Sequence, residues 1–82
     1  MKYEIEFKPR AIKDLEDLSK PTQAKILAKI QAMENDLQGD VKKLTHFTPE
    51  YRLRVGNYRV LFEVENEAIV IYRIKSRDKA YQ

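Results

Sequence analysis

The most constraining feature of this 82-residue chain is a pair of alternating segments on either side of Gly56-Asn57. Alternation with period two predicts strands, and a Gly-Asn pair between two strands predicts a hairpin with a two-residue loop. In that register Val55 pairs with Tyr58, and Arg54 lies directly opposite Arg59. Like charges directly across a pair of strands are destabilising. We therefore expect something anionic to bind against this side of the hairpin.

The two faces of the predicted hairpin differ in character. The face expected to pack on the core carries Tyr51, Leu53, Val55, Tyr58, Val60 and Phe62, and the opposite face carries Arg52, Arg54, Arg59 and Leu61. A guanidinium group offers a rigid fork of donors that matches phosphate oxygens. Several of them together can hold an RNA backbone, or stabilise the extra charge of a phosphorus transition state. The alternative is that long solubilising side chains fill exposed strand positions.

The rest of the sequence predicts an α+β fold in a single domain over residues 1–82. Period-two and helical spacing predict strands at Tyr3–Lys8, Tyr51–Val55, Tyr58–Glu65 and Ala68–Lys75, and helices at Pro9–Leu18 and Pro21–Leu37. The stretch Asp40–Glu50 is expected to connect the second helix to the hairpin. The order is therefore β-α-α-β-β-β. It predicts a helical hairpin packed on one face of a small, mostly antiparallel sheet.

The basic residues concentrate in the second half of the chain. Residues 1–40 hold seven Lys and Arg against eight Asp and Glu, whereas residues 41–82 hold nine against five. Such asymmetry indicates a polyanionic partner such as nucleic acid, and the alternative is an ordinary solvated basic face. Outside the hairpin, the candidate RNA-binding residues are Lys42, Lys43, Arg73, Lys75 and Lys79.

The C-terminal segment adds Arg77 and Tyr81 to the basic set. A two-residue turn at Asn66-Glu67 would place Arg73 on the face away from Arg59. A bulge, an odd-length loop or the tail beyond the strand would bring the later residues back to the Arg59 face. Spacing alone leaves these alternatives open. A tyrosine beside a basic cleft is a stacking platform for an unpaired base, and the alternative is a frayed tail residue.

Several classes of site are excluded or disfavoured by the composition. The chain has no cysteine, so it can form no disulfide, thiolate nucleophile or sulfur-ligated metal site. Its single histidine, His46, does not provide a histidine-based metal site, and its two glycines form no phosphate-binding loop. The longest uninterrupted apolar run is Ala68–Tyr72, so we expect no signal peptide and no membrane span. We expect a cytoplasmic protein without metal or cofactor.

The segment Tyr51–Val60, which reads Tyr-Arg-Leu-Arg-Val-Gly-Asn-Tyr-Arg-Val, follows a β-α-α block and precedes an apolar strand and an Arg-x-x-x-Tyr ending at Arg77–Tyr81. In this arrangement the chain resembles the RelE/ParE superfamily of toxins from type II toxin–antitoxin systems, over nearly its whole length. The RelE-like members imply a ribosome-dependent, metal-independent endoribonuclease. In these toxins the 2′-hydroxyl of messenger RNA in the ribosomal A site attacks the adjacent phosphate, which inhibits translation.

The resemblance also implies roles for particular residues. Arg52 and Arg54 fall where the family carries basic residues, often lysines, and Arg59 and Arg77 match arginines that stabilise the scissile phosphate. Tyr81 matches a tyrosine that stacks on a nucleotide. The catalytic candidates are therefore Arg52, Arg54, Arg59, Arg77 and Tyr81. Arginine is a poor proton acceptor, and Ser76 stands where many relatives carry histidine, so a conventional general base is missing.

The resemblance implies partners as well: a cognate antitoxin, and the ribosome with its messenger RNA. Two other functions remain open. ParE-like relatives inhibit DNA gyrase without cleaving RNA, and a plain basic module would bind nucleic acid without catalysis. Retention of Arg59, Arg77 and Tyr81 favours the RNase.

Overall fold

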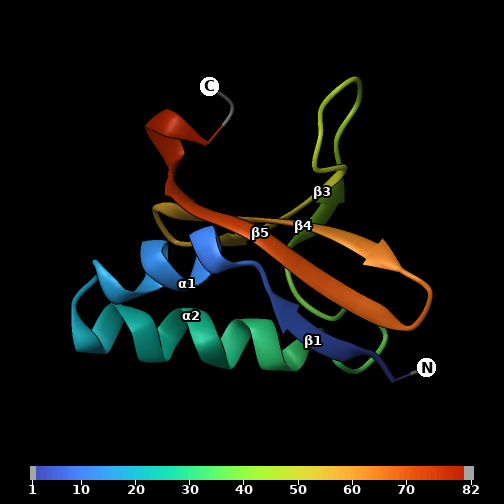
Figure 1. Ribbon diagram of the computed structural model, residues 1–82, viewed down its shortest axis with the longest axis horizontal. Helices are drawn as coiled ribbons and strands as arrows, with labels where there is room; N and C mark the ends of the chain where they lie inside the picture. Colours follow the sequence, from blue (N-terminus) through green and yellow to red (C-terminus); the bar gives the residue numbers. More distant parts are fainter. Residues whose placement is uncertain (1, 81–82) are drawn as a thin grey trace.

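Two helices lie against one face of a five-stranded sheet in the computed structural model, which describes residues 2–80 (Figure 1). In chain order the elements are β1 (Glu4–Phe7), α1 (Pro9–Glu16), α2 (Lys20–Ala32), β2 (Val41–Lys43), β3 (Tyr51–Val55), β4 (Tyr58–Glu65), β5 (Ala68–Ser76) and the short 3₁₀ helix η1 (Arg77–Lys79). The predicted α+β class and the helical hairpin on one face of the sheet are confirmed.

The strand order is β1-β5-β4-β3-β2, with β1 parallel to β5 and all other neighbours antiparallel. The sheet is thus mostly antiparallel, as predicted. The hairpin register is also as predicted, because Val55 pairs with Tyr58 and Arg54 with Arg59. The predicted element order was incomplete, since Asp40–Glu50 is not only a connection. It contains β2, which pairs with β3 and forms the outer edge of the sheet.

The second helix is shorter than predicted. Ser19 caps its start, where the Ser19 side chain accepts a hydrogen bond from the backbone N–H of Thr22 (3.4 Å). The helix ends at Ala32 instead of Leu37. In the turn that follows, Asp36 and Leu37 both adopt a left-handed backbone with φ of 57°, which a helix running to Leu37 could not contain. The carbonyl of Glu34 then accepts a hydrogen bond from Tyr3 (2.9 Å), which ties this turn to the first strand. The first helix ends two residues before the predicted Leu18.

The hydrophobic core lies between the helices and the sheet. It is formed by Ala11, Ile26, Ile30, Met33, Leu53, Val55, Val60, Phe62, Ile69, Ile71 and Ile74. The rings of Tyr51 and Phe62, which are paired across β3 and β4, stack with their centroids 5.5 Å apart. The apolar face predicted for the hairpin is therefore the core face, and the arginine face points away from both helices. No helix within residues 2–80 is long and apolar enough to cross a membrane.

A bulge in β5 determines to which face of the sheet the side chains after Ile71 point, a question that the sequence left open. Ile71 lies opposite Phe62, but Arg73 lies opposite Leu61, so Tyr72 is an extra residue on β5. The extra residue reverses the alternation for the rest of the strand. As a result Lys75 lies directly opposite Arg59, on the same face of the sheet. Without the bulge Arg73 and Lys75 would point to the core side of the sheet.

Asp14 ties α1 to β5 immediately after the bulge. The pairing of β1 with β5 ends at Phe7 and Ile71, which leaves the next part of β5 without a neighbouring strand on that side. Asp14 Oδ2 accepts hydrogen bonds from the Ile74 backbone N–H (3.0 Å) and Arg73 Nε (2.7 Å), and Oδ1 accepts from Arg73 Nη2 (3.1 Å). The carboxylate thus satisfies a strand N–H and holds the guanidinium in a two-pronged pair.

Burial by itself would raise the pKa of Asp14. The hydrogen bonds from Arg73 and Ile74, together with the charges of Arg73 and Arg10, outweigh it, so the pKa lies below the ordinary value of 3.8.

We predict that Asp14→Asn lowers the free energy of unfolding at neutral pH by about 1–2 kcal/mol, because an amide replaces a charge-assisted acceptor. A carboxyl with a depressed folded-state pKa stabilises the fold above its unfolded pKa, near 3.8. That contribution is lost as the pH falls through the folded-state value. Urea unfolding at a series of pH values should therefore show a gap that is full above roughly pH 5 and closes in acid.

The matched control for this experiment is Asp17→Asn, at an exposed carboxyl just beyond the same helix. Its stability should follow the wild type at every pH. A gap between Asp14→Asn and wild type that stays constant into strong acid would contradict the charged role of Asp14.

Candidate nucleic-acid interface

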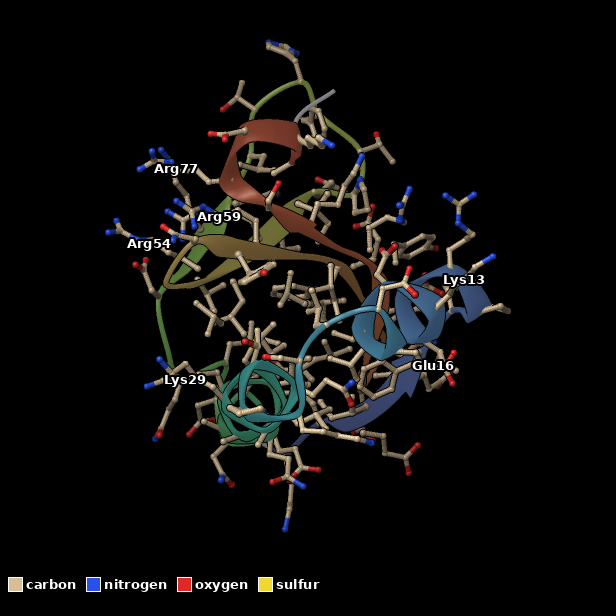
Figure 2. All side chains as sticks on the ribbon, turned by 90° about the vertical axis from the view of Figure 1, so that its left-hand side faces the viewer. Lys13, Glu16, Lys29, Arg54, Arg59 and Arg77 are labelled. Carbon is tan, nitrogen blue, oxygen red and sulfur yellow. The ribbon has the colours of Figure 1, made fainter. Side chains whose placement is uncertain are left out.

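The face of the sheet opposite the helices carries a cluster of five basic side chains, which we call the cationic face: Arg52, Arg54, Arg59, Lys75 and Arg77. Paired residues of neighbouring strands point to the same side of a sheet. Arg54, Arg59 and Lys75 therefore form one row across β3, β4 and β5. Figure 2 shows Arg54, Arg59 and Arg77 gathered together, on the far side of the sheet from α2. Three like charges in adjacent positions favour an anionic ligand.

Arg59 is the centre of the row, and it is only 8% exposed. Its Nη1 donates to the carbonyl oxygens of Gly56 (2.9 Å) and Tyr58 (3.0 Å). These bonds fix the guanidinium against the turn of its own hairpin. Within residues 2–80 the structure shows no carboxylate bound to it, so the charge of this largely buried guanidinium is held by neutral carbonyl groups.

The hairpin turn supplies those carbonyls because of its backbone conformation. Gly56 has a φ of +55°, whereas Asn57 does not have a positive φ. A positive φ at the first central residue alone is the pattern of a type II′ turn, which places glycine at this position and matches the twist of the strands. The Gly-Asn order of the sequence is explained in this way.

Arg77 reaches the cationic face from η1. Its backbone N–H donates to the carbonyl of Asn57 (2.7 Å), so the C-terminal segment is attached to the same turn that holds Arg59. A hollow of about 310 Å³ lies there, lined by Asn57, Ser76, Arg77 and Asp78. Figure 1 shows η1 on one side of the sheet's upper face and the loop that precedes β3 on the other. The arginines that the sequence separates are thereby brought to one end of the molecule.

Asp40 is the residue of this site that the sequence analysis missed. Arg52 Nη1 donates to Asp40 Oδ1 (3.0 Å) and to the Asp40 backbone carbonyl (2.7 Å), and Arg54 Nε lies 3.8 Å from Asp40 Oδ2. The hydrogen bond from Arg52 lowers the pKa of Asp40, against a smaller effect of burial, and the charges of Arg52, Arg54 and Arg59 act in the same direction. A recognised β2 would have revealed it, because the β2–β3 register continues to a pairing of Asp40 with Arg54.

The two remaining arginines of the hairpin, Arg52 and Arg54, therefore differ in how accessible they are to a ligand. The Arg52 side chain is 14% exposed and bound to Asp40, whereas the Arg54 side chain is 58% exposed. Arg52 is a positioned charge at the edge of the site. Arg54 is the arginine that a ligand can reach directly.

The other predicted RNA-binding residues fall into different environments. Lys42 pairs in register with Arg52, so it extends the cationic face, and Lys79 is exposed on η1. Lys43 lies 3.7 Å from Glu50 and 6.0 Å from the centre of the Tyr51 ring. Arg73 is held by Asp14 at the edge of the sheet. Tyr81 lies outside the described residues. Among residues 2–80, no group of His, Asp or Glu side chains is arranged to hold a metal ion.

The comparison with protein families matches residues 5–81 of the chain to the ParE toxin of the type II toxin–antitoxin system parDE. The matched range runs from β1 past η1. It therefore includes both helices, the hairpin and all of the cationic face.

Two curated proteins of Methanocaldococcus jannaschii are similar to the chain. The putative toxin RelE1 is 31% identical over 88 aligned positions, covering 100% of this chain and 98% of that protein. The toxin RelE3 is 43% identical over 47 residues, covering 57% of this chain and 53% of that protein, so this match spans about half of the relative.

A solved structure also resembles this fold. The crystal structure of a RelB-RelE antitoxin–toxin complex from Methanococcus jannaschii contains a chain with a TM-score of 0.74 and 30% identity. The match covers 89% of this chain and 91% of the other.

We predict that Gly56→Ala lowers the free energy of unfolding by about 1–2 kcal/mol, because a residue with a side chain resists a positive φ. A Cβ at this position would meet no atom within 4 Å, so the loss would report backbone strain alone. Gln38→Ala, at an exposed position, is the control and should unfold like the wild type in urea. Equal stability of Gly56→Ala and wild type would contradict the turn conformation.

Proposed function

Because this chain belongs to the RelE/ParE family of type II toxin–antitoxin toxins, we propose that it is an endoribonuclease. It cleaves messenger RNA in the ribosomal A site, in the cytoplasm, and thereby inhibits translation. The observation that carries the proposal is the row of Arg54, Arg59 and Lys75 across three strands, with Arg77 at its end. A phosphodiester bound there would meet several positive charges on one rigid surface.

The reaction that suits this surface is an internal transfer at phosphorus. The 2′-hydroxyl of a ribose loses its proton and its oxygen attacks the adjacent phosphate. The bond from phosphorus to the 5′-oxygen of the next nucleotide breaks, and that oxygen takes up a proton. The products are a 2′,3′-cyclic phosphate and a 5′-hydroxyl end. The transition state carries more negative charge on the oxygens bound to phosphorus than the substrate does. Fixed donors stabilise that charge without first having to reorganise.

The residues of the cationic face divide this work according to their surroundings. Arg59, which is fixed against the turn, and Arg77 contact the scissile phosphate, and the exposed Arg54 binds an oxygen of the same or the next phosphate. Arg52, which is held by a hydrogen bond to Asp40, contributes its positive charge. Tyr81 stacks on a base. Lys42, Lys75 and Lys79 bind flanking phosphates. Lys43 pairs in register with Tyr51 of the core face, so it lies on the other side of the sheet. For Arg73 the pair with Asp14 supports a structural role instead.

The proton of the 2′-hydroxyl needs an acceptor. The arginines remain charged at neutral pH and do not accept it. Asp40 has a lowered pKa, which makes its carboxylate a weak base. We therefore propose that the ribosome or the geometry of the bound message supplies the activation, so that the isolated protein cleaves free RNA slowly.

A second candidate function, from a different class, is inhibition of DNA gyrase without RNA cleavage. The matching family model is that of the ParE toxin, and the resemblance to ParE-like toxins implies this activity. This function predicts arrested supercoiling by purified gyrase and an intact message. A plain nucleic-acid-binding module, the third candidate, would show salt-sensitive binding and no toxicity.

The partner that we propose is an acidic antitoxin encoded beside this chain. The similar archaeal structure is a complex of toxin and antitoxin. The basic surface of this chain, with a formal net charge of +3, and the exposed apolar side chain of Ile12 fit a segment that is both acidic and amphipathic. Such a segment would cover the cationic face and prevent RNA from binding.

We predict that the protein, added to a translating extract, produces discrete cuts in a translated message, detected by primer extension. Arg59→Ala and Arg77→Ala should each slow the cleavage about 100-fold, the scale on which one fixed donor to a developing charge acts. Lys29→Ala, on α2 far from the cationic face, is the control and should cleave like the wild type (Figure 2).

An intact message, or cuts that persist at full rate in both arginine variants, would overturn the proposed RNase. If the message stays intact while gyrase supercoiling stops, the second candidate function is the correct one.

A further inference from the structure

One acidic side chain, that of Asp40, lies among the arginines of the cationic face. Asp40 stands at the entry to β2, and its carboxylate lies between Arg52 (3.0 Å) and Arg54 (3.8 Å). Its side chain is 54% exposed, so the carboxylate is at the surface where a ligand would arrive. Neither the architecture of the sheet nor the reaction described above requires a negative charge there.

The backbone and the side chain of Asp40 have separate tasks. The backbone carbonyl accepts hydrogen bonds from the Arg54 backbone N–H (3.0 Å) and from Arg52 Nη1 (2.7 Å), and these bonds hold β2 to β3. The carboxylate adds the second contact to Arg52 and the longer one to Arg54. Because the carboxylate itself is 54% exposed, its ion pairs contribute only modestly to stability. Replacing the carboxylate with an amide therefore leaves the fold intact and changes mainly the charge of the site.

A carboxylate and a phosphate compete for the same guanidinium donors, because both match the fork of an arginine. The pair between Arg54 and Asp40 is long, and the Arg54 side chain is 58% exposed, so Arg54 is free to exchange Asp40 for a phosphate. The Asp40 carboxylate is charged at neutral pH, since even the ordinary pKa of 3.8 lies well below 7, so it also repels an arriving phosphate. Both effects act against the ligand.

From this geometry we propose that Asp40 is an internal counter-ion that competes with RNA phosphate for Arg54 and holds the affinity of the cationic face below its maximum. The inference deepens the proposed function, since it takes RNA phosphate as the ligand of this face. It identifies a residue that tunes substrate affinity without being a catalytic residue. In the absence of RNA, Asp40 balances part of the charge that the row of arginines accumulates.

The test measures binding of a fluorescent single-stranded 2′-O-methyl oligonucleotide, which cannot be cleaved, by anisotropy at several salt concentrations. Asp40→Asn should bind about three- to tenfold more tightly at low salt. The slope of log affinity against log salt should become steeper by about 0.7, the value for one further charge contact to a single strand. A purely structural role for Asp40 would not steepen this slope. Asp40→Glu keeps the charge and should bind like the wild type.

Two controls make the result specific to this face. Glu16→Gln, on α1, changes the net charge by the same amount far from the cationic face, and should bind like the wild type (Figure 2). Arg54→Ala should bind more weakly, and Lys29→Ala, its control on α2, should not.

The outcomes separate the two proposals. If Arg54→Ala is weak but Asp40→Asn binds no more tightly than Glu16→Gln, the role of Asp40 is overturned and the proposed binding face stands. Weaker binding by Asp40→Asn would likewise overturn it, because Asp40 would then serve to orient Arg52 for the ligand. If Arg54→Ala binds like Lys29→Ala, RNA does not use this face, and both proposals fail.

Discussion

The pairing register of three neighbouring strands, β3, β4 and β5, determines on which face of the sheet their positive charges lie. The two-residue turn at Gly56-Asn57 sets Arg54 opposite Arg59, and the bulge at Tyr72 sets Lys75 opposite Arg59 on the other side. A shift of one residue in either pairing would send a positive charge into the core and an apolar residue to the surface. Because the core side is filled by buried residues such as Phe62 and Ile74, this register is strongly fixed.

Several contacts offset the repulsion between these neighbouring positive side chains. Arg59 is bound to carbonyl groups of its own turn, and Arg52 and Arg54 share the carboxylate of Asp40. Asp14 draws Arg73 away to the edge of the sheet. With these contacts the protein can fold with several positive charges side by side. The same charges can still attract a polyanion. Stability and binding are in this sense opposing demands on the same side chains.

Where the pattern was local, the sequence was sufficient to predict the structure. Alternation and the Gly-Asn pair predicted the hairpin and the opposition of Arg54 and Arg59, because turn type and register are determined by adjacent residues. The strand Val41–Lys43 was missed because three residues carry too little periodicity, and its existence depends on pairing with β3. The end of α2 was misplaced because Asp36 and Leu37 adopt their left-handed turn in a tertiary context that includes Tyr3. Asp40 and Asp14 were missed for the same reason, since each meets its arginines only in the folded chain.

We propose that RNA phosphate binds on the cationic face. The most direct measurement follows the side-chain Nε–H signals of the arginines by NMR while an uncleavable oligonucleotide is added. We expect the signals of Arg54, Arg59 and Arg77 to shift, whereas that of Arg10, which lies on α1, should not. Shifts centred on Arg10 with no change at Arg54, Arg59 and Arg77 would contradict it.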